Sequence, residues 1–154
     1  MDNGQGPMDK EGVANATIGI DPLLPAHQER DSMNMIALKS KAFAVRVVRM
    51  SRYMQQSENE FVLSKQVLRS GTSIGANVYE ATQAFTHADF AHKTSIALKE
   101  SVETEYWLEL LFETGFLSEA EFQSMYSDNK ELTKLLTAIL KTASRSSNKC
   151  SNSK

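Results

Sequence analysis

Apolar residues recur through the central part of the chain at spacings of three, four or seven positions, the rhythm of one helix face. Four such stretches follow one another and predict helices over residues 33–56, 60–84, 87–114 and 119–144. In the first stretch, Ile36, Phe43 and Met54 fall on one stripe. Short connections between amphipathic helices favour neighbours that run in opposite directions. The pattern therefore predicts an all-α fold, an antiparallel up-down-up-down four-helix bundle.

The predicted helix boundaries carry capping signals. A Ser or Thr followed three positions later by Glu or Asp can satisfy the free amides of a helix start. Three pairs have this spacing: Ser57 with Glu60, Thr86 with Asp89, and Ser118 with Glu121. Gly115, which two apolar residues follow, is typical of a left-handed cap at a helix end. These signals place short turns between the predicted helices.

The two ends of the chain lack the helical rhythm. Residues 1–31 combine scattered Gly and Pro with no sustained period, which predicts a mobile N-terminal arm. Leu23 and Leu24, between two prolines, give this arm an apolar spot that could dock on another surface. Residues 146–154 are polar and predict a disordered C-terminal tail. Residues 32–145 then form the four-helix bundle.

The composition fits one domain, since 154 residues with an apolar fraction of 41% can build one core of ordinary size. A net charge of -2 excludes a general attraction of the whole chain to nucleic acid or to anionic membrane. The only cysteine, Cys150, excludes an intrachain disulfide and a cysteine-based zinc site. Neither a secretory signal nor an apolar run of about 20 residues occurs, so we expect a cytoplasmic protein with no membrane partner.

Gly71 and Gly75, in the stretch LRSGTSIGANVYEA, raise the question of a phosphate-binding loop. A Walker loop needs Gly-x-x-x-x-Gly-Lys-Ser/Thr after a strand, and a dinucleotide fingerprint needs Gly-x-Gly-x-x-Gly. Neither pattern is present. Because the apolar stripe of the second helix runs past both glycines, we interpret them as a thin helix face that a neighbouring helix approaches closely. Packing there must offset a cost of about 1 kcal/mol for each glycine.

Three runs of sequence carry a family resemblance: FVLSKQVLRSGTSIGANVYEA, IALKESVETEYWLELLFETGFL and ELTKLLTAILKT. In their residues and in their order along the chain, they resemble the bacterial four-helix bundle proteins known as 23S rRNA intervening-sequence proteins. The resemblance covers about Ile36 to Ala143. That family is similar in fold to the accessory variability determinant protein of diversity-generating retroelements, and both are associated with ring-shaped homopentamers. The resemblance therefore implies a homo-oligomer, a pentamer, with no established catalytic activity and with RNA or DNA as a candidate partner.

Two polar features of the predicted helices have no settled role. Asn77 and Glu80 match polar positions of the family and lie beside the glycines. Glu105 falls at the edge of the apolar stripe of the third helix, and a partly buried carboxylate needs a cation or hydrogen-bond donors. We expect Arg46 or Arg69 to be its partner in a structural ion pair.

The first helix carries the best basic patch, outside its apolar stripe. The candidate nucleic-acid patch consists of Lys39, Lys41, Arg46, Arg49 and Arg52. Repeated around a ring, such a patch could contact phosphates even though the net charge is negative. The alternative is a merely solvated helix face, and no stacking platform of interleaved aromatic residues accompanies the patch.

Second apolar faces lie away from the core stripes of the first and third helices. The candidate oligomer interface consists of Val45, Val48, Ile96, Trp107 and Leu110. Contiguous exposed apolar surface usually marks an interface, so these residues predict a homo-oligomer that uses the two helices. The alternative is that Trp107 covers a loop or the N-terminal arm.

Residues suited to catalysis are sparse. A di-iron bundle needs Glu-x-x-His pairs on two helices, and none occurs in the sequence. The nearest approximation is Asp89 with His92, near Glu80 and His87, which we interpret as solvated surface. No Ser or Cys stands at a recognised motif spacing from a histidine. We therefore expect no catalytic residue, no metal and no cofactor.

The sequence thus favours a non-enzymatic, oligomeric interaction scaffold that associates with RNA or another nucleic acid. One alternative is a protein-binding adaptor without nucleic-acid affinity, whose acidic third helix and N-terminal arm recognise another polypeptide. The other alternative is a metal-dependent bundle enzyme.

Overall fold

The computed structural model describes residues 27–151, with side chains placed for residues 30–145. This part of the chain forms four helices: α1 (His27–Ser57), α2 (Leu63–Thr82), α3 (His87–Glu113) and α4 (Glu119–Ser151). No strand occurs between residues 27 and 151, so the prediction of an all-α fold is confirmed. None of the helices within these bounds is long and apolar enough to cross a membrane.

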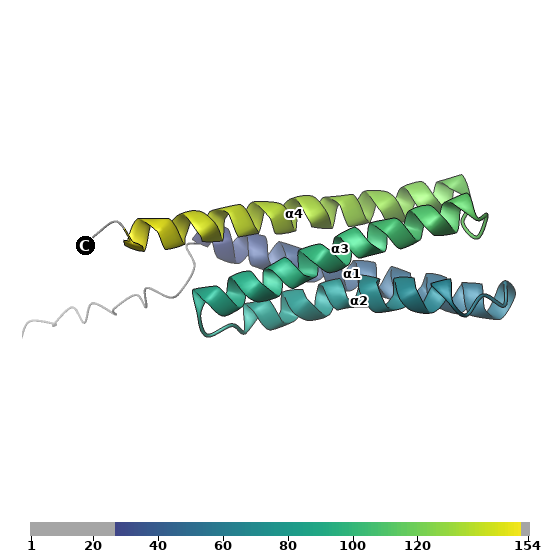
Figure 1. Cartoon of the computed structure of the whole chain (residues 1–154), viewed down its shortest axis with the longest axis horizontal. Helices are drawn as coiled ribbons and strands as arrows, with labels where there is room; N and C mark the ends of the chain where they lie inside the picture. The colour runs from purple at the N-terminus through teal and green to yellow at the C-terminus, as the bar shows by residue number, and fades with distance from the viewer. Residues whose placement is uncertain (1–26, 152–154) are drawn as a thin grey trace, which may run out of the picture.

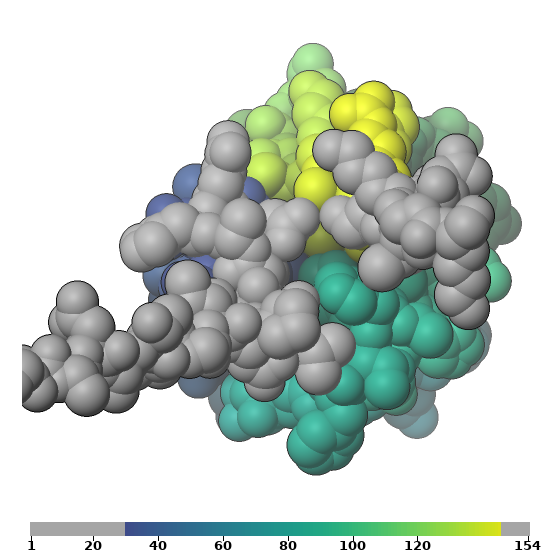
Figure 2. Space-filling model, turned by 90° about the vertical axis from the view of Figure 1, so that its left-hand side faces the viewer, coloured from purple at the N-terminus to yellow at the C-terminus, as the bar shows by residue number. Residues whose placement is uncertain are grey.

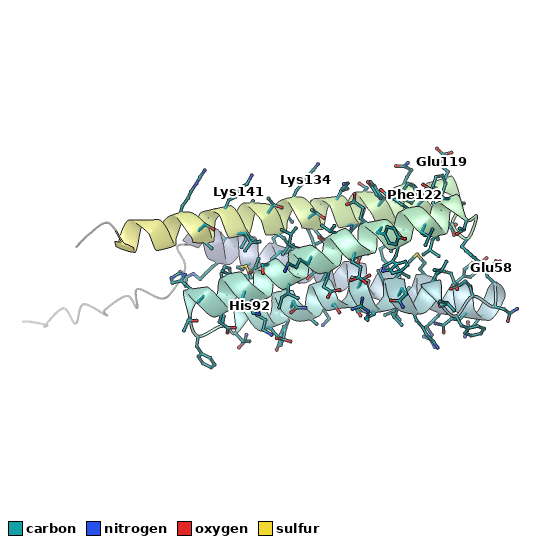
Figure 3. All side chains as sticks on the ribbon, viewed as in Figure 1. Glu58, His92, Glu119, Phe122, Lys134 and Lys141 are labelled. Atoms are coloured by element: carbon teal, nitrogen blue, oxygen red, sulfur yellow. The ribbon has the colours of Figure 1, made fainter. Side chains whose placement is uncertain are left out.

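The four helices lie side by side along the length of the molecule (Figure 1). α1 packs against α2 and α4, and α3 packs against the same two helices. α1 and α3 therefore occupy diagonally opposite positions. Glu58 and Glu119 lie at one end of the molecule, and His92 lies near the other end (Figure 3). An end-on view of that second end shows the α2–α3 turn, in teal, in the lower part of the surface (Figure 2).

The first and last helices of the chain extend beyond their predicted bounds. α1 begins at His27, so residues 27–31 of the predicted arm are helical, and α4 continues to Ser151, through most of the predicted tail. Neither extension contains a Gly or Pro that would end a helix, whereas Pro25 stands just ahead of α1. The remainder of the predicted arm, residues 1–26, and residues 152–154 lie outside the described residues.

Two of the predicted capping pairs form. Thr86 Oγ1 accepts a hydrogen bond from the Asp89 amide at 3.1 Å, at the start of α3. At the start of α4, the Ser118 amide donates to Glu121 Oε2 at 2.9 Å. Gly115 has a φ of 81°, the left-handed conformation predicted for the end of α3. The boundaries of α3 and of the α3–α4 turn therefore follow from local sequence chemistry.

The start of α2 differs from the prediction. Ser57 is the last residue of α1, and α2 begins at Leu63 instead of residue 60. The Glu60 carboxylate accepts hydrogen bonds from three successive backbone amides, at 2.9, 2.8 and 2.6 Å. Burial acts to raise the pKa of Glu60, but these amide donors outweigh it and hold the pKa below its ordinary value. One carboxylate therefore caps α2, and the predicted pairing of Ser57 with Glu60 is wrong.

All four helices contribute large apolar side chains to one core. The largest fully buried ones are Phe43, Ile36, Met54, Ile74, Leu108, Leu111, Leu132 and Leu136. Buried polar groups cross between helices: Thr104 Oγ1 donates to Ser70 Oγ at 2.9 Å, from α3 to α2. From α4 to α3, Asn129 Nδ2 donates to the Ser101 carbonyl oxygen at 2.9 Å. Such bonds replace the hydrogen bonds to water that these groups lose when they are buried.

α1 and α2 approach closely where α2 has no side chains. A Cβ placed on Gly71 would lie 2.8 Å and 2.9 Å from the two γ carbons of Val47. A Cβ on Gly75 would lie 3.4 Å from the carbonyl oxygen of Ser40, an ordinary van der Waals contact. Both glycines therefore stand inside α2 against α1, and Gly71 has the tighter neighbour.

Replacing each glycine with alanine should have opposite effects on stability. Gly71→Ala should lower the free energy of unfolding by about 1–3 kcal/mol, because the new methyl group overlaps the stiff, β-branched Val47. Gly75→Ala should raise it by up to about 1 kcal/mol, because alanine favours the helix and space is available. Urea unfolding measures both changes.

A double variant provides the control for this prediction. In a Val47→Ala background the overlap is removed, so Gly71→Ala should cost markedly less than it does in the native chain. Equal stability of the two single alanine variants would contradict the close approach at Gly71.

Candidate functional site

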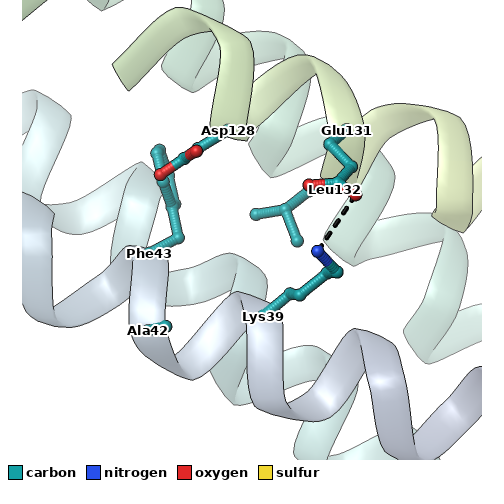
Figure 4. Close-up of a pocket in the computed structure, with 6 residues that line it drawn as sticks. All are labelled: Lys39, Ala42, Phe43, Asp128, Glu131 and Leu132. Carbon is teal, nitrogen blue, oxygen red and sulfur yellow. Dashed lines mark ion pairs between the residues drawn. The ribbon is translucent and has the colours of Figure 1, made fainter. Parts of the chain in front are cut away.

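The predicted nucleic-acid patch divides into two parts. Lys39 Nζ lies 3.0 Å from Glu131 Oε1 of α4, an ion pair that Figure 4 shows across the space between the two helices. Arg46 forms an ion pair with Asp128 of α4, and its Nη2 donates to Ser124 Oγ at 2.7 Å. These two cations are therefore engaged within the fold and do not belong to a free basic surface.

The other three cations of the patch are exposed. Lys41, Arg49 and Arg52 form no ion pair within the residues that the structure describes. Lys41 and Arg52 are eleven positions apart, about three helical turns, so they share one face of α1. Arg49, three positions before Arg52, is its neighbour on the helix surface and stands at the edge of the space between α1 and α4. Of the five predicted residues, these three thus remain as exposed cations, and the two that pair with α4 interrupt the patch.

Apolar side chains accompany the two cations on the outward side of α1. Leu38 is 74% exposed, Val45 44% and Val48 37%. We call the set Leu38, Lys41, Val45, Val48 and Arg52 the α1 outer face. Val45 and Val48, predicted as interface residues, are therefore exposed in the single chain, beside a third aliphatic residue that the sequence interpretation did not include.

The predicted interface residues on α3 are more sheltered. Ile96, Trp107 and Leu110 are each half-buried. The Trp107 ring packs against the core, and its Nε1 donates to Glu103 Oε1 at 3.1 Å. Because α1 and α3 are diagonally opposite, these residues cannot join Val45 and Val48 in one patch on one copy. In part Trp107 covers the core of its own chain.

A different set of α3 residues is exposed. Val102 is 56% exposed and Tyr106 57%, and the carboxylates of Glu109 and Glu113 lie on the same side of the helix. We call these four residues the α3 outer face. The sequence interpretation missed Val102 and Tyr106, although their spacing of four positions beside acidic residues was a readable signal.

Glu105 has partners other than those predicted. Its Oε1 accepts hydrogen bonds from Tyr126 Oη at 3.0 Å and from Lys130 Nζ at 2.6 Å, both on α4. The prediction of Arg46 or Arg69 is wrong, because Glu105 faces α4, whereas these arginines stand on α1 and α2. The hydrogen bond to Glu105 raises the pKa of Lys130 above its ordinary value. This contact fastens α3 to α4.

Glu100 and Glu103 lie on the side of α3 that faces α2. Arg69 of α2 pairs with Glu103. Glu100 Oε2 is buried and forms no hydrogen bond within the described residues. Burial raises the pKa of Glu100, the Glu103 carboxylate raises it further, and Arg69 opposes both effects. The fold therefore disfavours the ionisation of Glu100.

The remaining polar positions make local contacts. Asn77 Nδ2 donates to the Ser73 carbonyl oxygen at 2.9 Å, within α2, and Glu80 pairs with Lys93 of α3. His87 and His92 are exposed at the start of α3. Among the described residues, no group of three or more His, Cys, Asp or Glu side chains is arranged to hold a metal ion. Asn77 and Glu80 therefore have structural contacts that the sequence did not reveal.

Two hollows open between α1 and α4. The first has a volume of about 200 Å³. Phe43 and Leu132 are among the residues that line it, and the ion pair between Lys39 and Glu131 lies at its edge (Figure 4). The second, about 340 Å³, we call the Arg49 groove; its lining residues are Arg46, Arg49, Met50, Tyr53, Leu117, Glu121 and Met125. The Arg46–Asp128 ion pair joins α1 to α4 between the two hollows.

Comparison with known proteins gives a consistent result. The model of the family described as 23S rRNA-intervening sequence protein matches residues 33–138. A crystal structure from Bacteroides thetaiotaomicron VPI-5482, of a protein with unknown function from the S23 ribosomal protein family, is similar with a TM-score of 0.71. Its sequence is 50% identical, and the similarity covers 71% of this chain and 98% of that chain. No curated protein matches the chain.

Replacing Glu100 with Gln should stabilise the protein at neutral pH. A carboxyl group whose pKa is raised by folding stabilises the fold below its unfolded pKa, and that contribution is lost as the pH rises through the folded pKa. The Gln side chain stays neutral, so Glu100→Gln should raise the unfolding temperature at pH 7 and change it much less at pH 4.

The exposed Glu58 offers a matched control, because Glu58→Gln removes one carboxylate that lies outside the interfaces between helices. Its effect should be small at both pH values. If Glu100→Gln lowers the unfolding temperature at pH 7, the ionised carboxylate has a stabilising partner and the interpretation fails.

Proposed function

We propose that this chain, which belongs to the 23S rRNA-intervening sequence protein family, is a non-enzymatic interaction scaffold that associates with copies of itself. We further propose that its helices pack as an antiparallel up-down-up-down four-helix bundle. The observation that carries the proposal is the α1 outer face, where three aliphatic side chains are exposed on one helix side. Apolar surface of this kind is typical of protein interfaces.

The α3 outer face is a suitable counterpart on a second copy. Both faces carry exposed apolar side chains, Leu38 and Val45 on α1 and Val102 and Tyr106 on α3. Their charges are opposite, since the α1 outer face holds two cations and the α3 outer face two carboxylates. Complementary charges of this kind fix the orientation of an interface more than they add to its affinity. The α1 outer face of one copy should therefore bind the α3 outer face of the next.

The positions of the two faces determine the type of assembly. α1 and α3 are diagonally opposite, so each copy would use one side to bind one neighbour and the other side to bind the next. Contacts between unlike surfaces generate rings when the rotation closes and filaments when it does not. We propose a closed ring, with the pentamer that the family resemblance suggests as its expected size.

The absence of catalysis is likewise part of the proposal. Three acidic side chains of α2 and α3 are engaged in contacts between helices, Glu80 with Lys93, Glu103 with Arg69 and Glu105 with Lys130. These contacts support a structural role for the carboxylates. We expect neither a metal nor a cofactor to be required.

Charge placed on the α1 outer face should dissociate the assembly. The double variant Val45→Glu/Val48→Glu adds carboxylates to exposed positions, so it should leave the core intact while opposing the acidic α3 outer face. Light scattering should give a mass several times 17.2 kDa for the native chain and a mass near 17.2 kDa for the variant.

Tyr79→Glu is the control for this experiment, because Tyr79 is 68% exposed on α2, away from both outer faces. It should keep the full mass, and circular dichroism should show equal helix content in all three proteins. A native chain that is monomeric at micromolar concentration would disprove the proposal.

Association with RNA is a second candidate function. Exposure of Arg49, which lies outside the α1 outer face and forms no ion pair among the described residues, favours it, since a ring would repeat this cation on every copy. The divided patch and the net charge of -2 make it the weaker of the two.

A salt titration tests this second candidate. Binding of single-stranded RNA should weaken as salt rises, and Arg49→Glu, which leaves the α1 outer face unchanged, should weaken it further. If the chain has no affinity for RNA at low salt, the protein-binding adaptor is the better description of the scaffold.

A further inference from the structure

The C-terminal half of α4 has an outer side whose charged groups are all positive. Lys134, Lys141 and Arg145 are exposed there, and their spacings of seven and four positions place them on one line along the helix. Figure 3 shows Lys134 and Lys141 projecting from α4 away from the other three helices. Ala138, also exposed, stands between these two lysines on the same side. We call these four residues the α4 basic face.

No carboxylate neutralises the α4 basic face. None of its three cations forms an ion pair within residues 30–145. From Leu132 onward the sequence contains Lys and Arg but neither Asp nor Glu. The last two acidic residues of α4, Asp128 and Glu131, are paired with cations of α1. The net charge of -2 therefore conceals a local excess of positive charge on this half of α4.

The stability of the helix does not account for these charges. Cations near a helix C-terminus stabilise it through the free carbonyl groups, but this effect is confined to the last turn. Lys134 and Lys141 precede Ser151, the last residue of α4, by seventeen and ten positions. They are thus several turns away from the helix end, and their charge is available to a partner.

The composition of the face indicates which kind of partner fits. Protein interfaces have an apolar centre in which lysine is depleted. A helix that lies on a membrane needs an exposed apolar side beside its cations. Among the described residues of α4, no large apolar side chain is exposed, because its apolar stripe lies in the core. Exposed cations without an apolar centre instead match the phosphate groups of a nucleic acid.

The position of the aromatic residues favours a duplex over a single strand. Proteins that bind single strands stack the bases on aromatic side chains. The aromatic residues of α4, Phe122 and Tyr126, are half-buried and precede the basic face by two or more turns. A duplex keeps its bases stacked inside and its phosphates outside, so it needs no such stacking surface.

We propose that the α4 basic face binds the phosphate backbone of a nucleic-acid duplex. Its three cations span about 17 Å along the helix axis and each contacts one phosphate. Because phosphate contacts carry no sequence information, the binding is independent of sequence. The inference deepens the second candidate function, association with RNA, and assigns it to α4 instead of α1.

The proposed ring would multiply this binding. It uses the outer faces of α1 and α3, so it leaves the outer side of α4 free on every copy. Several faces that contact one duplex bind more tightly than one face alone. Only this multiplication rests on the proposed self-association, since a single copy already carries the complete α4 basic face.

Fluorescence anisotropy with the full-length chain tests the proposal. The probes are a short labelled RNA duplex, the DNA duplex of the same sequence, and one of the RNA strands alone. We expect a duplex to bind more tightly than the single strand, and the comparison of RNA with DNA identifies the preferred source of the phosphates. With three phosphate contacts, the duplex affinity should fall at least about 40-fold between 50 mM and 200 mM salt.

Neutral substitution of the face should remove the binding. The triple variant Lys134→Gln/Lys141→Gln/Arg145→Gln keeps helix-forming side chains at exposed positions, so its helix content by circular dichroism should be unchanged. Its duplex affinity at low salt should be lower by about tenfold or more. The conservative variant Lys134→Arg/Lys141→Arg keeps the charges and should bind as the native chain does.

A matched control removes the same charge elsewhere. Arg49→Gln/Lys65→Gln/Lys99→Gln neutralises three exposed cations on α1, α2 and α3 that form no ion pair among the described residues. It should retain most of the duplex affinity. If the control loses as much affinity as the α4 variant, net charge alone governs binding and the proposal is overturned.

The outcomes separate this inference from the proposed function. Loss of duplex binding in Arg49→Glu but not in the α4 variant keeps the second candidate function and disproves the α4 basic face. Preference for the single strand, or binding to vesicles of anionic lipid without binding to a duplex, also overturns the inference. If neither RNA nor DNA binds at low salt, both fail. A native chain that is monomeric by light scattering yet binds the duplex disproves the self-association alone.

Discussion

The close contact between α1 and α2 is the constraint on which the remaining packing depends. At Gly71 and Gly75 the backbone of α2 lies directly against Val47 and Ser40 of α1, because glycine has no side chain to separate the helices. Helices held this close must interlock their surface ridges, which fixes the rotation of each helix about its own axis. The side of α1 that faces solvent is set by the same rotation. The exposed apolar residues of the α1 outer face are thus a consequence of where the glycines stand.

The contact between α1 and α4 is of a different kind. It is bridged by charged side chains, Lys39 with Glu131 and Arg46 with Asp128, and every partner is between 38% and 54% exposed. Ion pairs as exposed as these typically contribute about 0–1 kcal/mol. Both hollows also open along this contact. The contact of α1 with α4 is therefore less tightly packed than its contact with α2.

Most of the fold could be predicted, because burying one apolar stripe per helix is a property of local sequence. The partners of individual side chains could not, because they depend on which helices become neighbours. Glu105 bonds to Lys130, and not to Arg46 or Arg69, since its side of α3 turns toward α4. The five-cation patch divides for the same reason, once α4 brings carboxylates beside Lys39 and Arg46. The Arg49 groove requires residues from α1, the α3–α4 turn and α4, and no local pattern combines them.

Asn129 is fully buried; its amide nitrogen bonds to the Ser101 carbonyl oxygen, while its own Oδ1 has no hydrogen-bond partner among the described residues. An apolar side chain of similar size would remove that unmet acceptor, so the asparagine costs stability where it stands. The same asparagine disfavours other alignments of the two helices. If α4 slid along α3 by one turn, the amide nitrogen would lose its hydrogen bond, and both the nitrogen and Oδ1 would be buried without partners. Buried asparagines in coiled coils exchange stability for a unique register in the same way. Asn129 thus favours the alignment of α3 and α4 in which its amide nitrogen meets the Ser101 carbonyl oxygen.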